Sequence, residues 1–138
     1  MKVLFLSILP FFSLVIGACS SGQTARDVVG RYYTSIEKGD FNRYMSCLSP
    51  YLQEETTRCF PTAEAWLKAI ATSQNTLSTS RIIRSEEIFN TAKVWVSEDK
   101  NHPEIGRVYF LEKYKGKWFI TKSMVLAKYE NDASHLDL

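Results

Sequence analysis

Hydrophobic positions follow a helical period in the first half of the chain and a strand period in the second half. After Thr24, apolar residues recur every three or four positions, which is the spacing of one buried helix face. Thr24 and Asp27 have the spacing of a capping box, and Lys38-Gly39 supplies the cation and the glycine typical of a helix end. The pattern predicts a first helix between Thr24 and Gly39.

Two further helices are predicted in the same half of the chain. Asp40 is placed to cap a second helix with an apolar stripe that reaches Leu48, and Ser49-Pro50 should stop or bend it. Residues 51–57 are expected to form only a short helical turn. The apolar stripe of residues 62–71 predicts a third helix, capped by the threonine at its start.

The period changes from about 3.6 to 2 after residue 73, which indicates strands. Four strands are predicted, at residues 76–88, 92–98, 105–115 and 118–129. Helices followed by strands with hairpin-sized connections predict an α+β fold. We expect N-terminal helices packed on the concave face of a curved antiparallel sheet of about four strands.

The first 18 residues form a separate segment with the parts of an export signal. Lys2 is followed by the apolar run Val3–Ile16, about 14 residues, which is too short for an ordinary membrane-spanning helix of roughly 20. The small residues Gly17 and Ala18 then precede Cys19. A simple secretory signal, cut near Ala18, would have the same parts.

Residues 15–19, Val-Ile-Gly-Ala-Cys, resemble the lipobox of bacterial lipoproteins, although Ile16 stands where the consensus prefers Leu. The resemblance implies cleavage between Ala18 and Cys19 and acylation of Cys19 with membrane lipid. Ser20 follows the cysteine where an Asp would tend to retain a Gram-negative lipoprotein at the inner membrane. The resemblance therefore favours the outer membrane, with the domain in the periplasm; a Gram-positive source would place it outside the only membrane.

Composition and charge set limits on this domain. Of 138 residues, 45% are hydrophobic and 23% are charged, as in an ordinary globular protein. The formal net charge of +2 and the dispersed basic residues give no argument for a nucleic-acid partner. The predicted division is a signal peptide at 1–18, a lipidated cysteine and tether at 19–24, one domain at 25–129 and a polar tail at 130–138.

Two cysteines remain besides Cys19, and export would place them in an oxidising compartment. An even pair there predicts a disulfide between Cys47 and Cys59. A redox or metal pair is the alternative. The spacing is not Cys-x-x-Cys and no histidine is near in sequence, which favours the disulfide.

The first helix pair and the last hairpin resemble nuclear-transport-factor-2-like domains. The residues that carry the resemblance are the apolar pattern of 25–41 with its Gly39-Asp40 step, and the hairpin of 114–120, in which Trp118 follows a glycine turn. The resemblance covers most of residues 24–128 and implies a cone of helices and sheet. That fold hosts isomerases, dehydratases, cyclases, transport adaptors and accessory domains, so it does not decide function.

An enzyme on this scaffold needs an inward-facing Asp or His with an orienting partner. Both histidines fall in polar segments, and the aspartates at the helix starts are explained as caps. Glu112 is the one carboxylate weighed as inward-facing, but Lys113 and Lys122 as strand neighbours favour a surface ion pair. We therefore expect no catalytic residues, no cofactor and no metal site.

The aromatic residues allow two interpretations. Tyr32, Tyr33 and Trp66 lie on helical stripes, where they either pack in the core or line a pocket with Glu112. Trp95 lies on the strand face opposite its buried neighbours, where it marks an interface or is covered by lysine stems.

The expectation from the sequence is a lipid-anchored domain of the cell envelope that is not an enzyme. It would bind an envelope protein, a second copy of itself or a small apolar molecule, and no nucleic acid. One alternative is a small isomerase, dehydratase or cyclase that uses the cone. Another is a lipoprotein component of a secretion or conjugation apparatus.

Overall fold

The computed structural model describes residues 22–71, 80–99, 101 and 106–126. The predicted signal peptide, Cys19, both histidines and the polar tail lie outside these residues. Four helices come first: α1 (Ala25–Lys38), α2 (Phe41–Ser46), α3 (Pro50–Cys59) and α4 (Ala63–Ala71). Four strands follow: β1 (Arg81–Ile88), β2 (Thr91–Ser97), β3 (Gly106–Tyr114) and β4 (Lys117–Leu126). The predicted α+β fold is confirmed.

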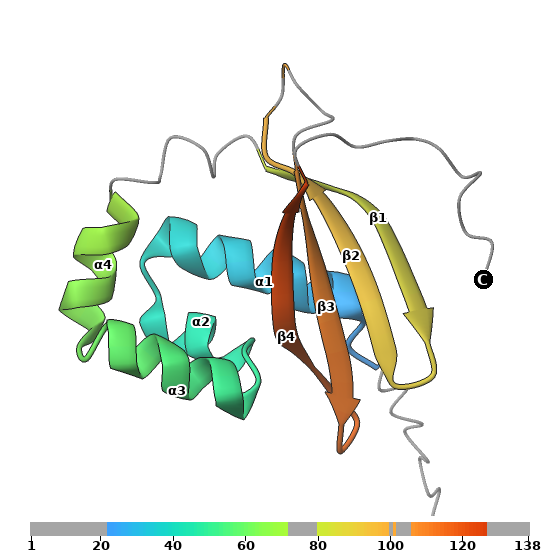
Figure 1. The fold of residues 1–138 in the computed structure, drawn as a ribbon, viewed down its shortest axis with the longest axis horizontal. Helices are drawn as coiled ribbons and strands as arrows, with labels where there is room; N and C mark the ends of the chain where they lie inside the picture. Colours follow the sequence, from blue (N-terminus) through green and yellow to red (C-terminus); the bar gives the residue numbers. More distant parts are fainter. Residues whose placement is uncertain (1–21, 72–79, 100, 102–105, 127–138) are drawn as a thin grey trace, which may run out of the picture.

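The four strands form one antiparallel sheet in the order β1-β2-β3-β4. The pairing shifts between Ile82 and Arg84 and again between Phe110 and Leu111, and such bulges bend a sheet. The helices lie on one side, with α1 crossing the sheet behind β4 in the view of Figure 1. Helix α1 contacts β1, β2 and β4, so one helix covers the inner face of the sheet.

Helix α1 begins and ends as its sequence predicts. The Asp27 amide donates to Oγ1 of Thr24 at 3.1 Å, and the Thr24 amide donates to Oδ2 of Asp27 at 2.9 Å. The hydrogen bonds from Thr24 lower the pKa of the Asp27 carboxyl from its ordinary value. Gly39 ends the helix with a φ of 65°, a conformation that favours glycine.

The second helix ends earlier than predicted, at Ser46. Leu48 instead forms a parallel bridge with Ile120 of β4. The Ile120 amide donates to the Cys47 carbonyl at 2.8 Å, and the Ser49 amide donates to the Ile120 carbonyl at 2.9 Å. These two bonds pair residues 47–49 with the edge of β4. Because their backbone groups bond to β4, these residues do not continue the helix.

Residues 50–59 form a full helix, α3, where only a short turn was predicted. Ser49 is its N-cap, with Oγ accepting from the Leu52 amide at 3.4 Å, and Pro50 occupies the first turn, where proline is favoured. Ser49-Pro50 therefore starts a helix as well as stopping one. No α3 residue is fully buried, so the segment lacks the apolar stripe that reveals a helix in sequence.

The predicted disulfide between Cys47 and Cys59 is absent, and both residues are free cysteines. Nε2 of Gln53 donates to the Leu48 carbonyl at 3.0 Å, which holds the chain beside Cys47 against the first half of α3. Cys59 is the last residue of α3, six residues or about 9 Å farther along the helix axis. Disulfides need Cα atoms within roughly 4.4–6.8 Å, so the helix keeps the two thiols apart.

The described helices are all short. Among the described residues, none is long and apolar enough to cross a membrane. The core lies between α1 and the inner face of the sheet, and most of its buried side chains are aliphatic, with Tyr33, Tyr109 and Trp118 buried among them.

Candidate functional site

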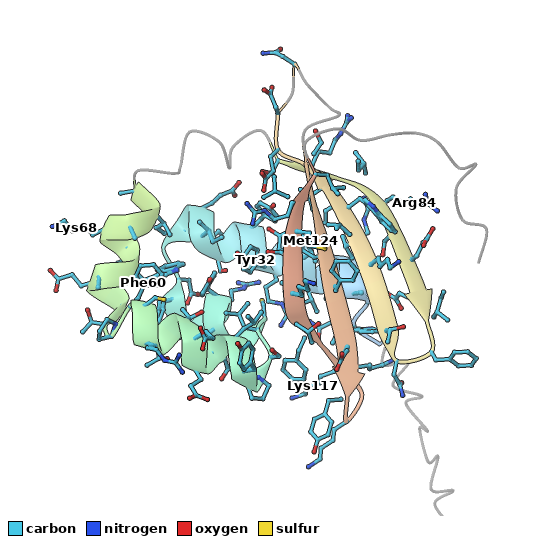
Figure 2. The ribbon with its side chains drawn as sticks, viewed as in Figure 1. Tyr32, Phe60, Lys68, Arg84, Lys117 and Met124 are labelled. Atoms are coloured by element: carbon cyan, nitrogen blue, oxygen red, sulfur yellow. The ribbon has the colours of Figure 1, made fainter. Side chains whose placement is uncertain are left out.

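Aromatic side chains from α1, α2, α4 and β3 fill the space between the helices and the inner sheet face. The Tyr32 ring centroid is 5.1 Å from that of Tyr44 and 5.5 Å from that of Tyr109. The Tyr44 centroid is in turn 4.9 Å from that of Trp66. Tyr32 lies between the helices and the sheet in Figure 2. The members of this aromatic cluster are Tyr32, Tyr33, Phe41, Tyr44, Trp66 and Tyr109.

The polar atoms of this region bond to one another. The Tyr33 and Tyr109 hydroxyls are 2.9 Å apart, and the Tyr33 hydroxyl donates to Oε1 of Glu98 at 3.2 Å. Nε of Arg107 donates to the same carboxylate oxygen at 2.9 Å. One carboxylate at the end of β2 is thus held by a phenol from α1 and a guanidinium from β3.

Burial governs the ionisation of the tyrosines. Burial, followed by the neighbouring hydroxyls, raises the pKa of Tyr32 and Tyr109 far above the usual range for tyrosine. Burial also raises the pKa of Tyr33, although its hydrogen bond to Tyr109 works in the opposite direction. These phenols are protonated at neutral pH, so they donate hydrogen bonds and do not act as bases.

The structure brings three of the four predicted pocket residues together and separates the fourth. Tyr32, Tyr33 and Trp66 belong to the aromatic cluster, and Trp66 is buried in it. Glu112 is exposed, and it borders a shallow hollow on the outer face of the sheet with Lys93 and Phe110. The exposure of Glu112 agrees with the surface position favoured from the sequence, and the ion pair with Lys113 or Lys122 stays a prediction.

Sequence reasoning missed the inward-facing carboxylate, Glu98. Ala92, Val94 and Val96 alternate on the buried face of β2, and Glu98 continues that alternation by one more step. The same period places Arg107 and Tyr109 on the inner face of β3. The signal was present in the sequence, because a residue two positions beyond a buried valine points to the same side.

Two hollows among the described residues lie beside the aromatic cluster. One of about 340 Å³ lies between α1 and β1, and Tyr33 is the only cluster member that lines it. Another, of about 330 Å³, lies between α1, α3 and β4 beside Trp118. Neither hollow is lined by Glu98, Arg107 or Tyr109. Within the described part of the chain, no three potential ligands gather to hold a metal ion.

The outer face of the sheet carries a second group of aromatic and apolar residues. The Arg84 guanidinium carbon is 4.9 Å from the centre of the Trp95 ring, so an arginine covers this tryptophan in place of the predicted lysine stem. The strand register aligns Trp95 with Val108 and Met124. Phe110 follows in the next outward row, with Nζ of Lys93 at 5.8 Å from its ring centre.

Comparisons with known proteins identify no family for this chain. No family model and no curated protein matches it. A SEC-C motif containing protein from Rhodopseudomonas palustris aligns over 75% of this chain and 82% of its own, with 11% identity and a TM-score of 0.46. An NTF2-like protein of unknown function from Cytophaga hutchinsonii aligns over 77% and 91%, with 14% identity and a TM-score of 0.38. At these scores neither likeness carries an argument, so the fold assignment rests on the elements themselves.

Proposed function

We propose that this chain is a lipid-anchored, non-enzymatic domain of the cell envelope that binds a protein partner through the outer face of its sheet. The observation that carries the proposal is the aromatic cluster on the inner face. Aromatic rings occupy the space that an enzyme of this architecture would keep open for substrate, and their polar atoms bond to one another. The outer face of the sheet carries the second group of aromatic and apolar residues, so it is the surface proposed for a partner.

The anchoring half of the proposal rests on the sequence of residues 15–20. The lipobox resemblance makes Cys19 the acylated residue, and Ser20 favours the outer membrane with the domain in the periplasm. Each buried methylene contributes about 0.8 kcal/mol, so several acyl chains hold far better than one. We also propose that the domain is nuclear-transport-factor-2-like, because its first helix pair and last hairpin resemble those of such domains.

The partner half rests on the composition of the outer face. Trp95, Phe110 and Met124 project from neighbouring strands, and Met124 is 44% exposed. Arg84 and Lys93 border the two rings. Aromatic residues, methionine and arginine are the types enriched in protein interfaces, which favours a protein over a small molecule at this face.

The anchor is tested by the variant Cys19→Ala. In cells, the unaltered protein should partition into the detergent phase of a membrane extract, and the variant should lose that partitioning. Labelled fatty acid should enter the unaltered protein only. Continued partitioning of the variant would show that another segment holds the protein.

The partner surface is tested by a photo-crosslinking amino acid at Phe110 in intact cells. We expect a discrete adduct that weakens at least fivefold when Trp95→Ser is added, because the tryptophan is the largest group of the same surface. The matched control is the same label at Tyr51, which is 67% exposed on α3. Equal adducts at both positions would remove the outer face as the binding surface.

Glu98 supports a second candidate, a small isomerase or dehydratase. It is a carboxylate on the inner face, held by Tyr33 and Arg107 in the manner of a positioned acid or base. The test is the exchange of a proton between a small carbonyl compound and water in the presence of the protein. If the protein has this function, it should catalyse the exchange and Glu98→Gln should abolish it. Glu112→Gln, on the outer face, is the matched control.

A further inference from the structure

Both tight turns of the sheet lie at one end of the molecule. The β1–β2 turn contains Phe89 and Asn90, and the β3–β4 turn contains Lys115 and Gly116. The Lys113 amide donates to the Asn90 carbonyl at 2.8 Å, which ties the first turn to β3. We call this region, residues 88–90 and 113–117, the hairpin end; Figure 1 shows it at the lower side of the sheet.

The chain enters the domain at the same end. The Ala25 amide, at the start of α1, donates to Oε1 of Glu87 at 2.7 Å, one residue before the hairpin end. Gln23 lines the same hollow as Lys117, next to the other turn. In Figure 1 the short coil that leads into α1 comes from the side of the β1–β2 turn. The junction to the predicted tether therefore lies at the hairpin end.

The hairpin end combines exposed apolar groups with lysines. Phe89 is 95% exposed, Tyr114 is 64% exposed and Ile88 is 63% exposed. Phe89 also has a φ of 54°, a conformation that glycine or asparagine adopts more easily than phenylalanine. The ring thus packs on almost nothing in the domain, and a bulky residue there has no structural advantage.

Lysines alternate through the second turn. The sequence Lys-Tyr-Lys-Gly-Lys at 113–117 has three cations in five residues and no acid. Lys117 lies at the hairpin end in Figure 2, whereas Lys68 of α4 lies far from it. Aromatic rings with lysines are the combination that binds the interface of a bilayer with anionic headgroups.

We propose that the hairpin end is a membrane-contact surface that binds anionic phospholipid headgroups. The inference rests in part on the proposed acylation of Cys19. Gln23 is four residue steps beyond Cys19, and a fully extended chain of that length spans at most about 14 Å. A tether this short brings the end where it attaches against the bilayer, where Phe89 and Tyr114 enter the interface and the lysines meet phosphate.

The orientation is tested with the full lipidated protein in vesicles of phosphatidylethanolamine and phosphatidylglycerol that contain brominated lipid. A tryptophan is introduced by Phe89→Trp, by Tyr114→Trp or, as the matched control, by Asn101→Trp. Asn101 is exposed beyond the opposite end of β2, and seven strand residues span roughly 23 Å. Quenching of the three native tryptophans is measured in the unaltered protein and subtracted. We then expect the bromines to quench the introduced tryptophan at 89 and 114 at least threefold more than at 101.

The lipid contact is tested separately in the chain from residue 19 with Cys19→Ser, which lacks the acyl site. It should bind the same vesicles weakly, and each of Lys113→Ala, Lys115→Ala and Lys117→Ala should lower the partition coefficient about fivefold. Lys68→Ala is the matched control and should leave it unchanged. Neutral phosphatidylcholine vesicles should bind far less, and free phosphate should not compete at millimolar concentration.

The two experiments separate failure of the anchor from failure of the contact. If the lipidated protein floats with the vesicles but quenching is equal at 89, 114 and 101, the contact is wrong and the anchor stands. If the full protein binds the vesicles no more tightly than the Cys19→Ser chain, and both bind through the three lysines, the anchor is wrong and the contact stands. Loss of binding in Lys68→Ala equal to that in Lys115→Ala would also overturn the contact.

Discussion

The hydroxyls of Tyr33 and Tyr109 are 2.9 Å apart, and only one of them can donate into that contact. Because Tyr33 donates to Glu98, Tyr109 is left to donate to Tyr33. Arg107 supplies the charge that balances Glu98. At the scale of single residues, the inner face is therefore a chain of mutually dependent polar groups, and removing one leaves another without its partner.

Tyr33→Phe tests that dependence. It removes a donor to Glu98 and the acceptor of Tyr109, so we expect a loss of about 1–3 kcal/mol in the free energy of unfolding. For a domain of this size, each kcal/mol corresponds to roughly 4–8 °C in melting temperature. Tyr109→Phe should behave alike, and the double variant should lose less than the sum.

Tyr114→Phe is the matched control, because its hydroxyl lies on an exposed side chain. Thermal unfolding followed by circular dichroism gives all four values. Additive losses for Tyr33→Phe and Tyr109→Phe would mean that the two hydroxyls do not act as a pair.

The tyrosines also make stability depend on pH. Burial raises the pKa of Tyr33 and Tyr109, so the folded protein keeps protons that the unfolded chain loses above its ordinary tyrosine pKa. The free energy of unfolding should therefore fall as pH rises above about 10. Urea midpoints between pH 8 and 11.5 measure the slope, which should be shallower when both residues are phenylalanine. An identical slope would contradict the assignment.

At the scale of elements, the two ends of α1 set its position. The capping box fixes its start beside β1, and Gly39 turns the chain sharply into α2. Because Gly39 has a positive φ and lies against Leu67, the turn also sets how closely α4 approaches the junction of α1 and α2. Two glycines on or next to this helix allow a matched comparison.

Gly39→Ala and Gly30→Ala should change stability in opposite directions. A Cβ at Gly39 would lie 2.7 Å from Cδ2 of Leu67 and would adopt a φ of 65°, so we expect a loss of about 1–2 kcal/mol. A Cβ at Gly30 would meet Cδ1 of Ile82 at 4.0 Å, an ordinary contact. Alanine is favoured over glycine inside a helix by up to about 1 kcal/mol, so Gly30→Ala should stabilise. Urea unfolding measures both, and equal signs would contradict the packing described.

At the scale of the whole molecule, the free cysteines lead to a prediction about redox conditions. Dithiothreitol should not change the melting temperature of the chain from residue 22, because there is no bond to reduce. Cys59 is exposed and should react with a thiol reagent in the native state. Cys47 is buried, burial raises the pKa of its thiol, and it should react only on unfolding. A melting temperature that falls when dithiothreitol is added would show that the two cysteines do form a disulfide.

The pattern of the chain predicts this architecture where periodicity is strong. Helix α1 and the four strands follow from it, because their apolar residues repeat at the period of one buried face. Helix α3 has no buried residues, so the apolar period does not predict it. The disulfide prediction was wrong because it rested on an even number of cysteines in an oxidising compartment. Neither fact gives the distance between Cys47 and Cys59, which depends on helix α3. Glu98 was within reach, and continuing the alternation of β2 one step farther finds it.

The bond from Ala25 to Glu87 has a mechanical consequence if Cys19 carries lipid. A force between bilayer and domain enters the fold at Thr24, and the first contact to resist it is this hydrogen bond to the edge strand β1. Behind it, α1 lies across β1, β2 and β4, so extracting the helix requires sliding it along the sheet, with many contacts strained together. Forced unfolding depends on the unfolding rate, and Glu87→Ala should raise that rate under tension more than Glu86→Ala at the neighbouring position.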